Sequence, residues 1–263
     1  MKITVIGGGN MGGAIAAGAI KADIVKAGDV TISHLEPKCH DLFGEFLSQI
    51  KIEDDNAKSI EGADLVIVAV KPWMMSEVLG EIVDKIDRTK QALVSIAAGV
   101  TFEVLHEMMK CEELGKLGMY RIIPNTAIAI AQSTSFICKT NTSETQDAQL
   151  LSIFNALGAS FIITEDQMTP LTSLSSCGIA FAYKYIDASI EGGVELGIDV
   201  ELARDVVLQT VRGALMMLET NSTMPQPEID KVTTKGGITE KGLKAMAENG
   251  FAEAVKSGLV ASK

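Results

Sequence analysis

Clusters of basic side chains are missing from this chain of 263 residues, whose formal net charge is −11. Binding to nucleic acid or to an anionic membrane surface depends on grouped lysine and arginine side chains, so we expect neither partner. No apolar run approaches the length of a membrane span. The apolar run at residues 3–6 is also too short for the apolar core of a signal peptide. These absences favour a protein that acts on a small molecule.

Metal and disulfide patterns are missing as well. No two cysteines have Cys-x-x-Cys spacing and no two histidines have His-x-x-x-His spacing, although the chain contains Cys39, Cys111, Cys138, Cys177, His34, His40 and His106. We therefore expect no metal site and a reducing, cytoplasmic environment. Aromatic residues are scarce at 5%, whereas 47% of the residues are hydrophobic, which suits an α/β layer followed by close-packed helices.

The first part of the chain alternates short apolar runs with helical patterns. Strands are predicted at residues 3–6, 30–35, 65–70, 92–97, 119–123 and 160–164. Helices are predicted at residues 11–21, 38–47, 75–86 and 102–109. Such alternation predicts a doubly wound parallel sheet of the Rossmann type.

Beyond about residue 165 the pattern becomes helical throughout, with predicted helices at 168–191, 200–220 and 239–259. We therefore expect a dinucleotide-binding domain at 1–165 and an all-helical domain at 166–263. Helices this rich in small apolar side chains bury little surface alone. Packing against a second copy of the chain is the simplest remedy, so we expect a homodimer or a larger homo-oligomer.

A glycine turn follows the first predicted strand and reads Gly7-Gly8-Gly9-Asn10-Met11-Gly12. In a G-x-G-x-x-G turn, Gly7 permits the sharp bend, Gly9 lets the backbone approach a pyrophosphate and Gly12 lets the helix lie close to the strand. The helix N-terminus then offers free N–H groups and a partial positive charge to phosphate. The turn, with Asn10 and Met11, predicts a nicotinamide dinucleotide site.

The end of the second strand faces the adenosine ribose in such folds. Ser33 and Glu36 are found there, with no arginine nearby. A carboxylate accepts hydrogen bonds from ribose hydroxyls and repels a 2′-phosphate, so Glu36 favours NADH over NADPH. The alternative is that Glu36 is a solvated acid at a helix start.

Two further segments end strands at the carboxyl edge of the predicted sheet, where ligands bind in open α/β folds. They are Val70-Lys71-Pro72 and Ala97-Ala98-Gly99. The small side chains leave room for the nicotinamide ring and its ribose. A solvated loop lysine is the alternative interpretation of Lys71.

Five segments resemble successive motifs of the pyrroline-5-carboxylate reductases: Val70–Pro72, Ser95–Gly99, Arg121–Thr126, Gln209–Ala214 and Val232–Thr239. They occur in the family's order along essentially the whole chain. The resemblance implies a Rossmann domain, a helical domain that interlocks with a partner subunit, and NADPH as cofactor. It also implies reduction of 1-pyrroline-5-carboxylate to proline.

The resemblance carries residue roles with it. Asn56 would hold the adenosine ribose. Thr234, Gly236, Gly237 and Thr239 would hold the substrate, with Thr239 close to the ring nitrogen. We also expect Asn125 and Lys235 of this chain to contribute to substrate binding. An alcohol is a poor acid, so we expect Thr239 to orient the substrate first and to relay a proton second.

The glycine loop before the last predicted helix also indicates a substrate site, independently of the family resemblance. Glycines that precede a helix N-terminus form an anion site of backbone N–H groups, which suits a carboxylate substrate. Lys235 adds positive charge. The alternative is a capping turn with Thr239 as the N-cap.

The chain departs from the family motifs at several places: Leu35-Glu36, Ala127, Ser176, Cys177, Ile179 and Lys235. Two other functions therefore stay open. One is a related imine or hydroxyacid reductase, although Lys184 is the only lysine near the place where hydroxyacid dehydrogenases carry a catalytic one. The other is a non-catalytic sensor of dinucleotide or proline. The intact Gly236-Gly237 loop favours the reductase.

Overall fold

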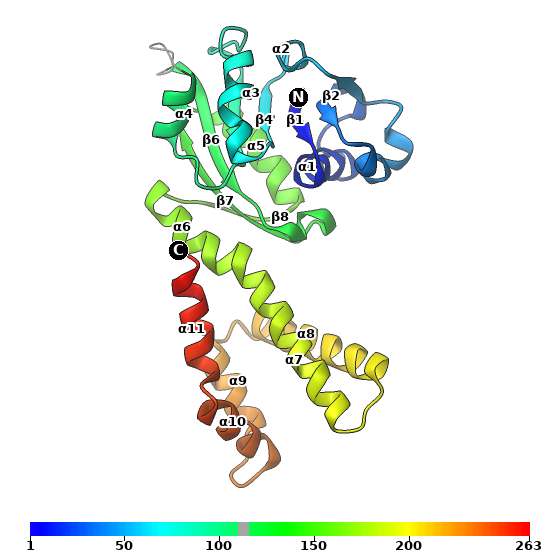
Figure 1. Ribbon diagram of the computed structural model, residues 1–263, viewed down its shortest axis with the longest axis vertical. Helices are drawn as coiled ribbons and strands as arrows, with labels where there is room; N and C mark the ends of the chain where they lie inside the picture. The colour runs from blue at the N-terminus through cyan, green and yellow to red at the C-terminus, as the bar shows by residue number, and fades with distance from the viewer. Residues whose placement is uncertain (110–115) are drawn as a thin grey trace. The chain divides into compact units, whose positions relative to one another are not determined.

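The computed structural model describes residues 1–109 and 116–263, which form two compact units, Met1–Ser176 and Cys177–Lys263 (Figure 1). Cys111 lies outside the described residues. The first unit extends past residue 165 because α6 (Met168–Thr172) buries Met168 against Ile123, Phe136 and Cys138 of the sheet.

One eight-stranded sheet forms the centre of the first unit, in the order β3-β2-β1-β4-β5-β6-β7-β8. Its strands are β1 (Ile3–Gly8), β2 (Val30–Leu35), β3 (Lys51–Glu53), β4 (Leu65–Val68), β5 (Ala92–Ser95), β6 (Gly118–Ile123), β7 (Ser133–Thr140) and β8 (Gly158–Ile162). All neighbouring pairs are parallel except β6 and β7, which are antiparallel. The predicted doubly wound parallel sheet is therefore confirmed, with the one difference that β7 pairs antiparallel with β6. The short connection from β6 turns the chain straight back, and only antiparallel pairing allows that.

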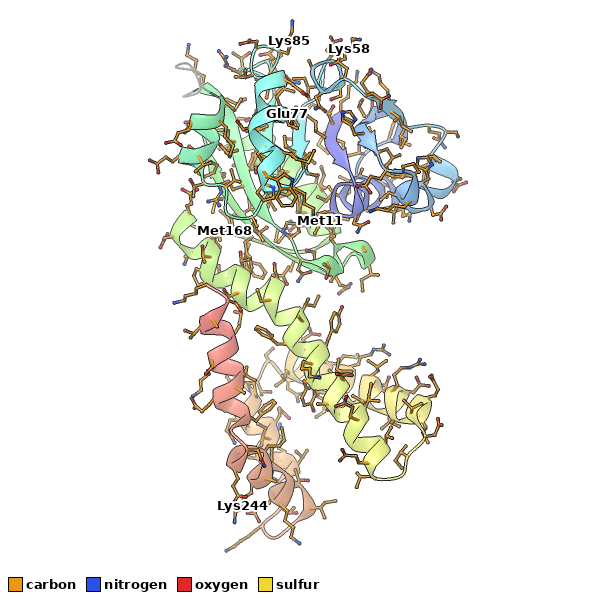
Figure 2. All side chains as sticks on the ribbon, in the orientation of Figure 1. Met11, Lys58, Glu77, Lys85, Met168 and Lys244 are labelled. Atoms are coloured by element: carbon orange, nitrogen blue, oxygen red, sulfur yellow. The ribbon has the colours of Figure 1, made fainter. Side chains whose placement is uncertain are left out.

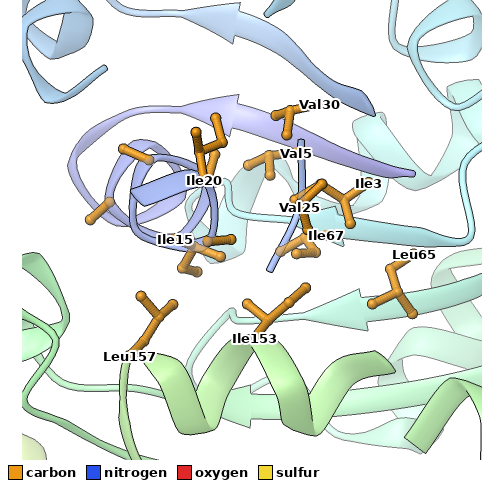
Figure 3. Packing of buried hydrophobic residues seen from close by; sticks show 14 of the residues in the cluster. Ile3, Val5, Ile15, Ile20, Val25, Val30, Leu65, Ile67, Ile153 and Leu157 are labelled. Carbon is orange, nitrogen blue, oxygen red and sulfur yellow. The ribbon is translucent and has the colours of Figure 1, made fainter. Parts of the chain in front are cut away.

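Helices cover both faces of the sheet. The helices α1 (Asn10–Lys21) and α5 (Glu144–Ala156) pack on one face, and α2 (Asn56–Ser59), α3 (Met75–Ile82) and α4 (Phe102–Met109) on the other. Figure 3 shows Ile15 of α1 and Ile153 of α5 beside Leu65 and Ile67 of β4. Val66 and Val68 of the same strand join the core on the opposite face, as the two-residue period of a strand requires.

Some local predictions are wrong for identifiable reasons. The expected helix at 38–47 is a pair of 3₁₀ turns, Pro37–Leu42 and Gly44–Phe46, divided where Gly44 has a φ of 53°. The strands β3 and β7 and the helix α5 were not predicted, since β3 has only three residues and neither β7 nor α5 shows a long apolar pattern.

The second unit is helical. It contains α7 (Gly178–Glu195), α8 (Val200–Asn221), α9 (Pro225–Val232), α10 (Ile238–Glu248) and α11 (Phe251–Ala261). A π-helical turn at Ser173–Cys177 interrupts the helix expected at 168–191. The helix expected at 239–259 breaks at Gly250, whose φ is 76°, and α9 lies between the helices expected at 200–220 and 239–259.

Burial is very low in this second unit, where Ala203 is the only buried residue of 177–263. Leu196, Leu202, Leu215 and Met216 are among its many exposed apolar side chains. Within the described part of the chain, no helix is both long enough and apolar enough to cross a membrane.

Candidate active site

The glycine turn lies where β1 runs between β2 and β4, at the reversal of strand order. Gly7 has a φ of 97°, and a Cβ atom there would lie 2.8 Å from the Ala69 carbonyl oxygen. A Cβ atom on Gly12 would lie only 2.2 Å from the carbonyl oxygen of Gly7. Both positions therefore require glycine, and the close contact brings the start of α1 directly against the strand.

The first turn of α1 presents backbone N–H groups that suit a phosphate. Gly9 is the N-cap and makes no side-chain capping bond, and no acidic residue lies in the first turn of the helix. Met11 of this turn is labelled in Figure 2 and is half-buried. These N–H groups and the helix dipole would suit an anion, and the phosphate site itself stays a prediction.

Asn10 of the same turn contacts the segment after β2. Its Oδ1 atom accepts a hydrogen bond of 3.8 Å from the Cys39 thiol. Burial, and then the charge of Glu36, raise the pKa of Cys39. The thiol therefore stays protonated and able to donate.

Glu36 lies over the glycine turn. A Cβ atom on Gly9 would lie 2.8 Å from Glu36 Oε1, and the backbone N–H of Glu36 donates to the Gly8 carbonyl at 3.2 Å. Glu36 Oε2 is 2.7 Å from Lys38 Nζ, and both side chains are largely exposed. The Glu36 hydrogen bond, and then its charge, raise the pKa of Lys38. A carboxylate thus borders the place where the backbone can approach a pyrophosphate.

Asn56, predicted to hold the ribose, is almost fully buried and bonded at both ends of its amide. Ser33 Oγ donates to Asn56 Oδ1 at 2.6 Å, and Asn56 Nδ2 donates to Glu81 Oε2 of α3 at 2.6 Å. Ser33 has no exposed surface. Its hydroxyl therefore supports Asn56 and has no free surface with which to touch a ligand.

The remaining predicted cofactor residues gather at the ends of β4 and β5. Val70 packs against the turn, since its Cγ1 atom would lie 2.9 Å from a Cβ atom on Gly7. Lys71 and Pro72 are exposed. At the end of β5, Ala97 is buried, while Ala98 and Gly99 are exposed. The parallel strands β1, β4 and β5 bring these segments to one edge of the sheet, as predicted.

Asn125 follows β6 and is buried. Its Oδ1 atom caps the backbone N–H of Ala127 at 3.1 Å, and its Nδ2 atom donates to Ser175 Oγ at 3.1 Å. Ser175 belongs to the π-helical turn, a feature that is frequent at functional sites. Asn125 therefore anchors that turn to the end of β6.

The predicted substrate loop connects α9 and α10 in the second unit, where Thr234, Lys235 and Thr239 are exposed. Gly237, and not Thr239, is the N-cap of α10. The Gly237 N–H donates to the Thr234 carbonyl at 2.9 Å, and the Gly236 N–H donates to Glu240 Oε2 at 2.6 Å. The Glu240 carboxylate therefore accepts from one of the backbone N–H groups that were expected to bind the substrate.

Two acids that accept hydrogen bonds from predicted site residues are not indicated by any sequence pattern. Glu81 and Glu240 are exposed helix residues, which periodicity treats as solvated. Neither stands in a glycine motif. In 1–109 and 116–263, no group of acids, cysteines and histidines could hold a metal ion.

Comparison with known proteins identifies the family. Residues 165–263 match the family model for pyrroline-5-carboxylate reductase dimerisation, and residues 2–99 match the model for NADP oxidoreductase, coenzyme F420-dependent. The pyrroline-5-carboxylate reductase of Methanosarcina acetivorans is 32% identical over 98% of this chain and 94% of its own. The chain belongs to the pyrroline-5-carboxylate reductase family.

Other members of the pyrroline-5-carboxylate reductase family agree in sequence and fold. Pyrroline-5-carboxylate reductase 1 of Dictyostelium discoideum is 30% identical over 99% of this chain, which spans 48% of that relative. The crystal structure of Plasmodium falciparum pyrroline carboxylate reductase with NADP bound superposes with a TM-score of 0.88. It is 28% identical and covers 100% of this chain and 95% of its own. The predicted Rossmann-type sheet followed by helices is thus confirmed.

Proposed function

We propose that this chain reduces the cyclic imine 1-pyrroline-5-carboxylate to proline with a nicotinamide dinucleotide. The observation that carries the proposal is the glycine turn, whose close contacts open α1 at the strand-order reversal of a pyrroline-5-carboxylate reductase family member. Backbone N–H groups at the start of α1 would hold the pyrophosphate, and the edge formed by Val70–Pro72 and Ala97–Gly99 would border the nicotinamide ribose. The bound dinucleotide supplies the hydride.

The chain has little chemistry to add to hydride transfer. A cyclic iminium already carries its proton, so the protein needs to hold the imine carbon in place and satisfy the ring nitrogen. Thr239 and Thr234 supply exposed hydroxyls beside the Gly236-Gly237 loop. We assign Thr239 to orient the ring nitrogen. Thr239→Val should then lower kcat about tenfold while the melting temperature is maintained; parental kcat would contradict this role.

We also propose that Glu36 favours NADH over NADPH. Its carboxylate borders Gly9, and a 2′-phosphate near that position would meet like charge only partly offset by Lys38. Glu36→Gln should therefore lower the ratio of kcat/KM for NADH to that for NADPH by about fivefold. Glu61→Gln, the same substitution at another exposed acid of the first unit, is the matched surface control. An unchanged ratio, or a parental preference for NADPH, would overturn the assignment.

A homodimer held by the helical unit is the third part of the proposal. Residues 165–263 match a dimerisation family, and apolar side chains of 177–263 are exposed in the single chain. Sedimentation velocity should give a dimer or a larger oligomer. A monomer at micromolar concentration would contradict it.

The experiment for the activity follows dinucleotide oxidation with pyrroline-5-carboxylate, using NADH and NADPH in parallel. Turnover supports the reductase. Cofactor binding without turnover on any cyclic imine would favour the sensor instead. Turnover only on other imines or on 2-oxo acids would favour a related reductase.

A further inference from the structure

We propose that Glu81 is a positioning residue that fixes the orientation of the Asn56 amide at the cofactor site. The inference rests on the dinucleotide site of the proposed function. Glu81 lies on α3, outside every motif of the sequence, and its side chain contacts the site through a hydrogen bond from Asn56.

The orientation of the amide follows from the chemistry of its two neighbours. A carboxylate has no hydrogen to donate, whereas a serine hydroxyl both donates and accepts. Glu81 Oε2 therefore requires the Nδ2 atom of Asn56 to face it, at 2.6 Å. The Oδ1 atom then faces Ser33, whose hydroxyl donates across the other 2.6 Å contact. Ser33 alone would satisfy either orientation, so Glu81 decides between them.

The fixed orientation determines what Asn56 offers to a ligand. One Nδ2 hydrogen is used by Glu81, and the second remains. Asn56 lies beside Ser33 near the end of β2, the side of such folds that faces the adenosine ribose. Asn56 is 6% exposed, and in this orientation the second Nδ2 hydrogen is the donor that we assign to a ribose or 2′-phosphate oxygen. If the amide reversed, the same position would offer a carbonyl oxygen, which can accept from a ribose hydroxyl but repels a 2′-phosphate.

Two variants test the carboxylate at position 81. Glu81→Gln keeps an oxygen that can accept from Asn56 Nδ2, but its own amide can also donate, so it permits both orientations of the Asn56 amide. Glu81→Ala removes the partner altogether. The control is Glu77→Ala, an exposed acid one turn earlier on α3 and labelled in Figure 2. Because both acids are exposed, all three variants should fold with nearly parental melting temperatures.

The experiment measures dissociation constants for NADH and NADPH by titration of the purified full chain, together with kcat at saturating cofactor. We expect Glu81→Ala to weaken NADPH binding about fivefold to tenfold and NADH binding less, with kcat unchanged. Glu77→Ala, which removes the same charge from α3, should stay within about twofold of the parent, and Glu81→Gln should give a loss between those of the other two variants. The side-chain amide resonances of Asn56 should shift in Glu81→Ala and should not shift in Glu77→Ala.

Three results would overturn the inference. One is parental affinity in Glu81→Ala, and another is an equal loss in Glu81→Ala and Glu77→Ala, which would assign the effect to charge. The third is a fall in kcat with unchanged affinity. Failure of the proposed function would look different, because the parent itself would then bind neither dinucleotide.

Discussion

The two units of this chain reach stability by different routes. Residues 1–176 bury strands and helices on both faces of one sheet, and their apolar side chains form closed clusters. In residues 177–263 only Ala203 is buried, and Leu215 is 57% exposed. The first unit is complete as a single chain, whereas the second has apolar surface that only another surface can cover. We therefore expect cofactor binding to depend mainly on the first unit and subunit assembly on the second.

The largest effect is expected when negative charge is placed on the exposed apolar face of α8. Leu208 and Leu215 are two helical turns apart and therefore share a face. The double variant Leu208→Asp/Leu215→Asp should raise the dimer dissociation constant by about 1,000-fold or more, because burying unpaired carboxylates costs several kcal/mol. Sedimentation velocity measures it, with Glu219→Gln on the same helix as control.

That double variant should lose reductase turnover but retain cofactor affinity, since the predicted cofactor residues lie in the first unit. A dimer of unchanged strength would show that α8 lies outside the interface.

A substitution in the glycine turn should weaken dinucleotide binding by the first unit and leave subunit assembly unchanged. Gly12→Ala places a Cβ atom 2.2 Å from the Gly7 carbonyl oxygen, so α1 must move away from the strand. We expect a loss of dinucleotide affinity of about 100-fold or more, measured by calorimetry, with the oligomeric state unchanged. Gly28→Ala is the control, because its Cβ atom would meet nothing within 4 Å. Parental dinucleotide affinity in Gly12→Ala would show that the glycine turn is not part of the dinucleotide site.

The pH dependence of the free energy of unfolding gives a further comparison between the two units. Tyr120 is buried in the first unit and donates to Asp147 Oδ1 at 2.7 Å. Burial, and then this hydrogen bond, raise the pKa of Tyr120 above its usual value of 10. Its stabilising contribution is therefore complete below pH 10 and is lost as the pH rises, because the unfolded tyrosine ionises first.

The free energy of unfolding should fall by about 1.4 kcal/mol per pH unit above pH 10 from this group. Urea unfolding at several pH values measures the slope, and Tyr120→Phe should lack this part of it. Equal slopes in the two proteins would contradict the assignment. Tyr183 of the second unit is 61% exposed and offers the comparison variant Tyr183→Phe.

The smallest expected effect concerns the loop of the second unit. Glu240 accepts from the Gly236 N–H, a donor predicted for the substrate carboxylate. Glu240→Gln replaces a charged acceptor with a weaker neutral one, so KM for pyrroline-5-carboxylate should fall about threefold. KM for 1-pyrroline, which has no carboxylate, should not change. Glu248→Gln on the same helix is the control, and a raised KM in Glu240→Gln would mean that Glu240 supports the loop instead.

Sequence reasoning succeeded where a local pattern decides the structure. The glycine turn, the strand β2 and the helix α4 have the predicted positions, because close contacts and periodic apolar residues act over a few positions. It failed where the periodicity of apolar residues does not reveal a break or a reversal of the chain. Gly250 stops a helix that periodicity continues, and β7 turns back against β6 because of its short connection.

The candidate site divides in the same way. Gly7, Gly9 and Gly12 can be predicted from spacing, and Asn56 from the family resemblance. No pattern predicted that Ser33 would face Asn56, or that Glu81 would hold the other end of its amide. These contacts join β2, α2 and α3, whose separation along the chain carries no periodic signal.

By itself, the sequence determined the family, the dinucleotide turn and the change from alternating to helical structure near residue 165, because each depends on residues close together in the chain. Only the tertiary structure decided the direction of β7, the exposed apolar surface of 177–263 and the neighbours of Asn56. A hydrogen bond between distant residues forms only once packing has fixed both partners, and composition does not record that packing.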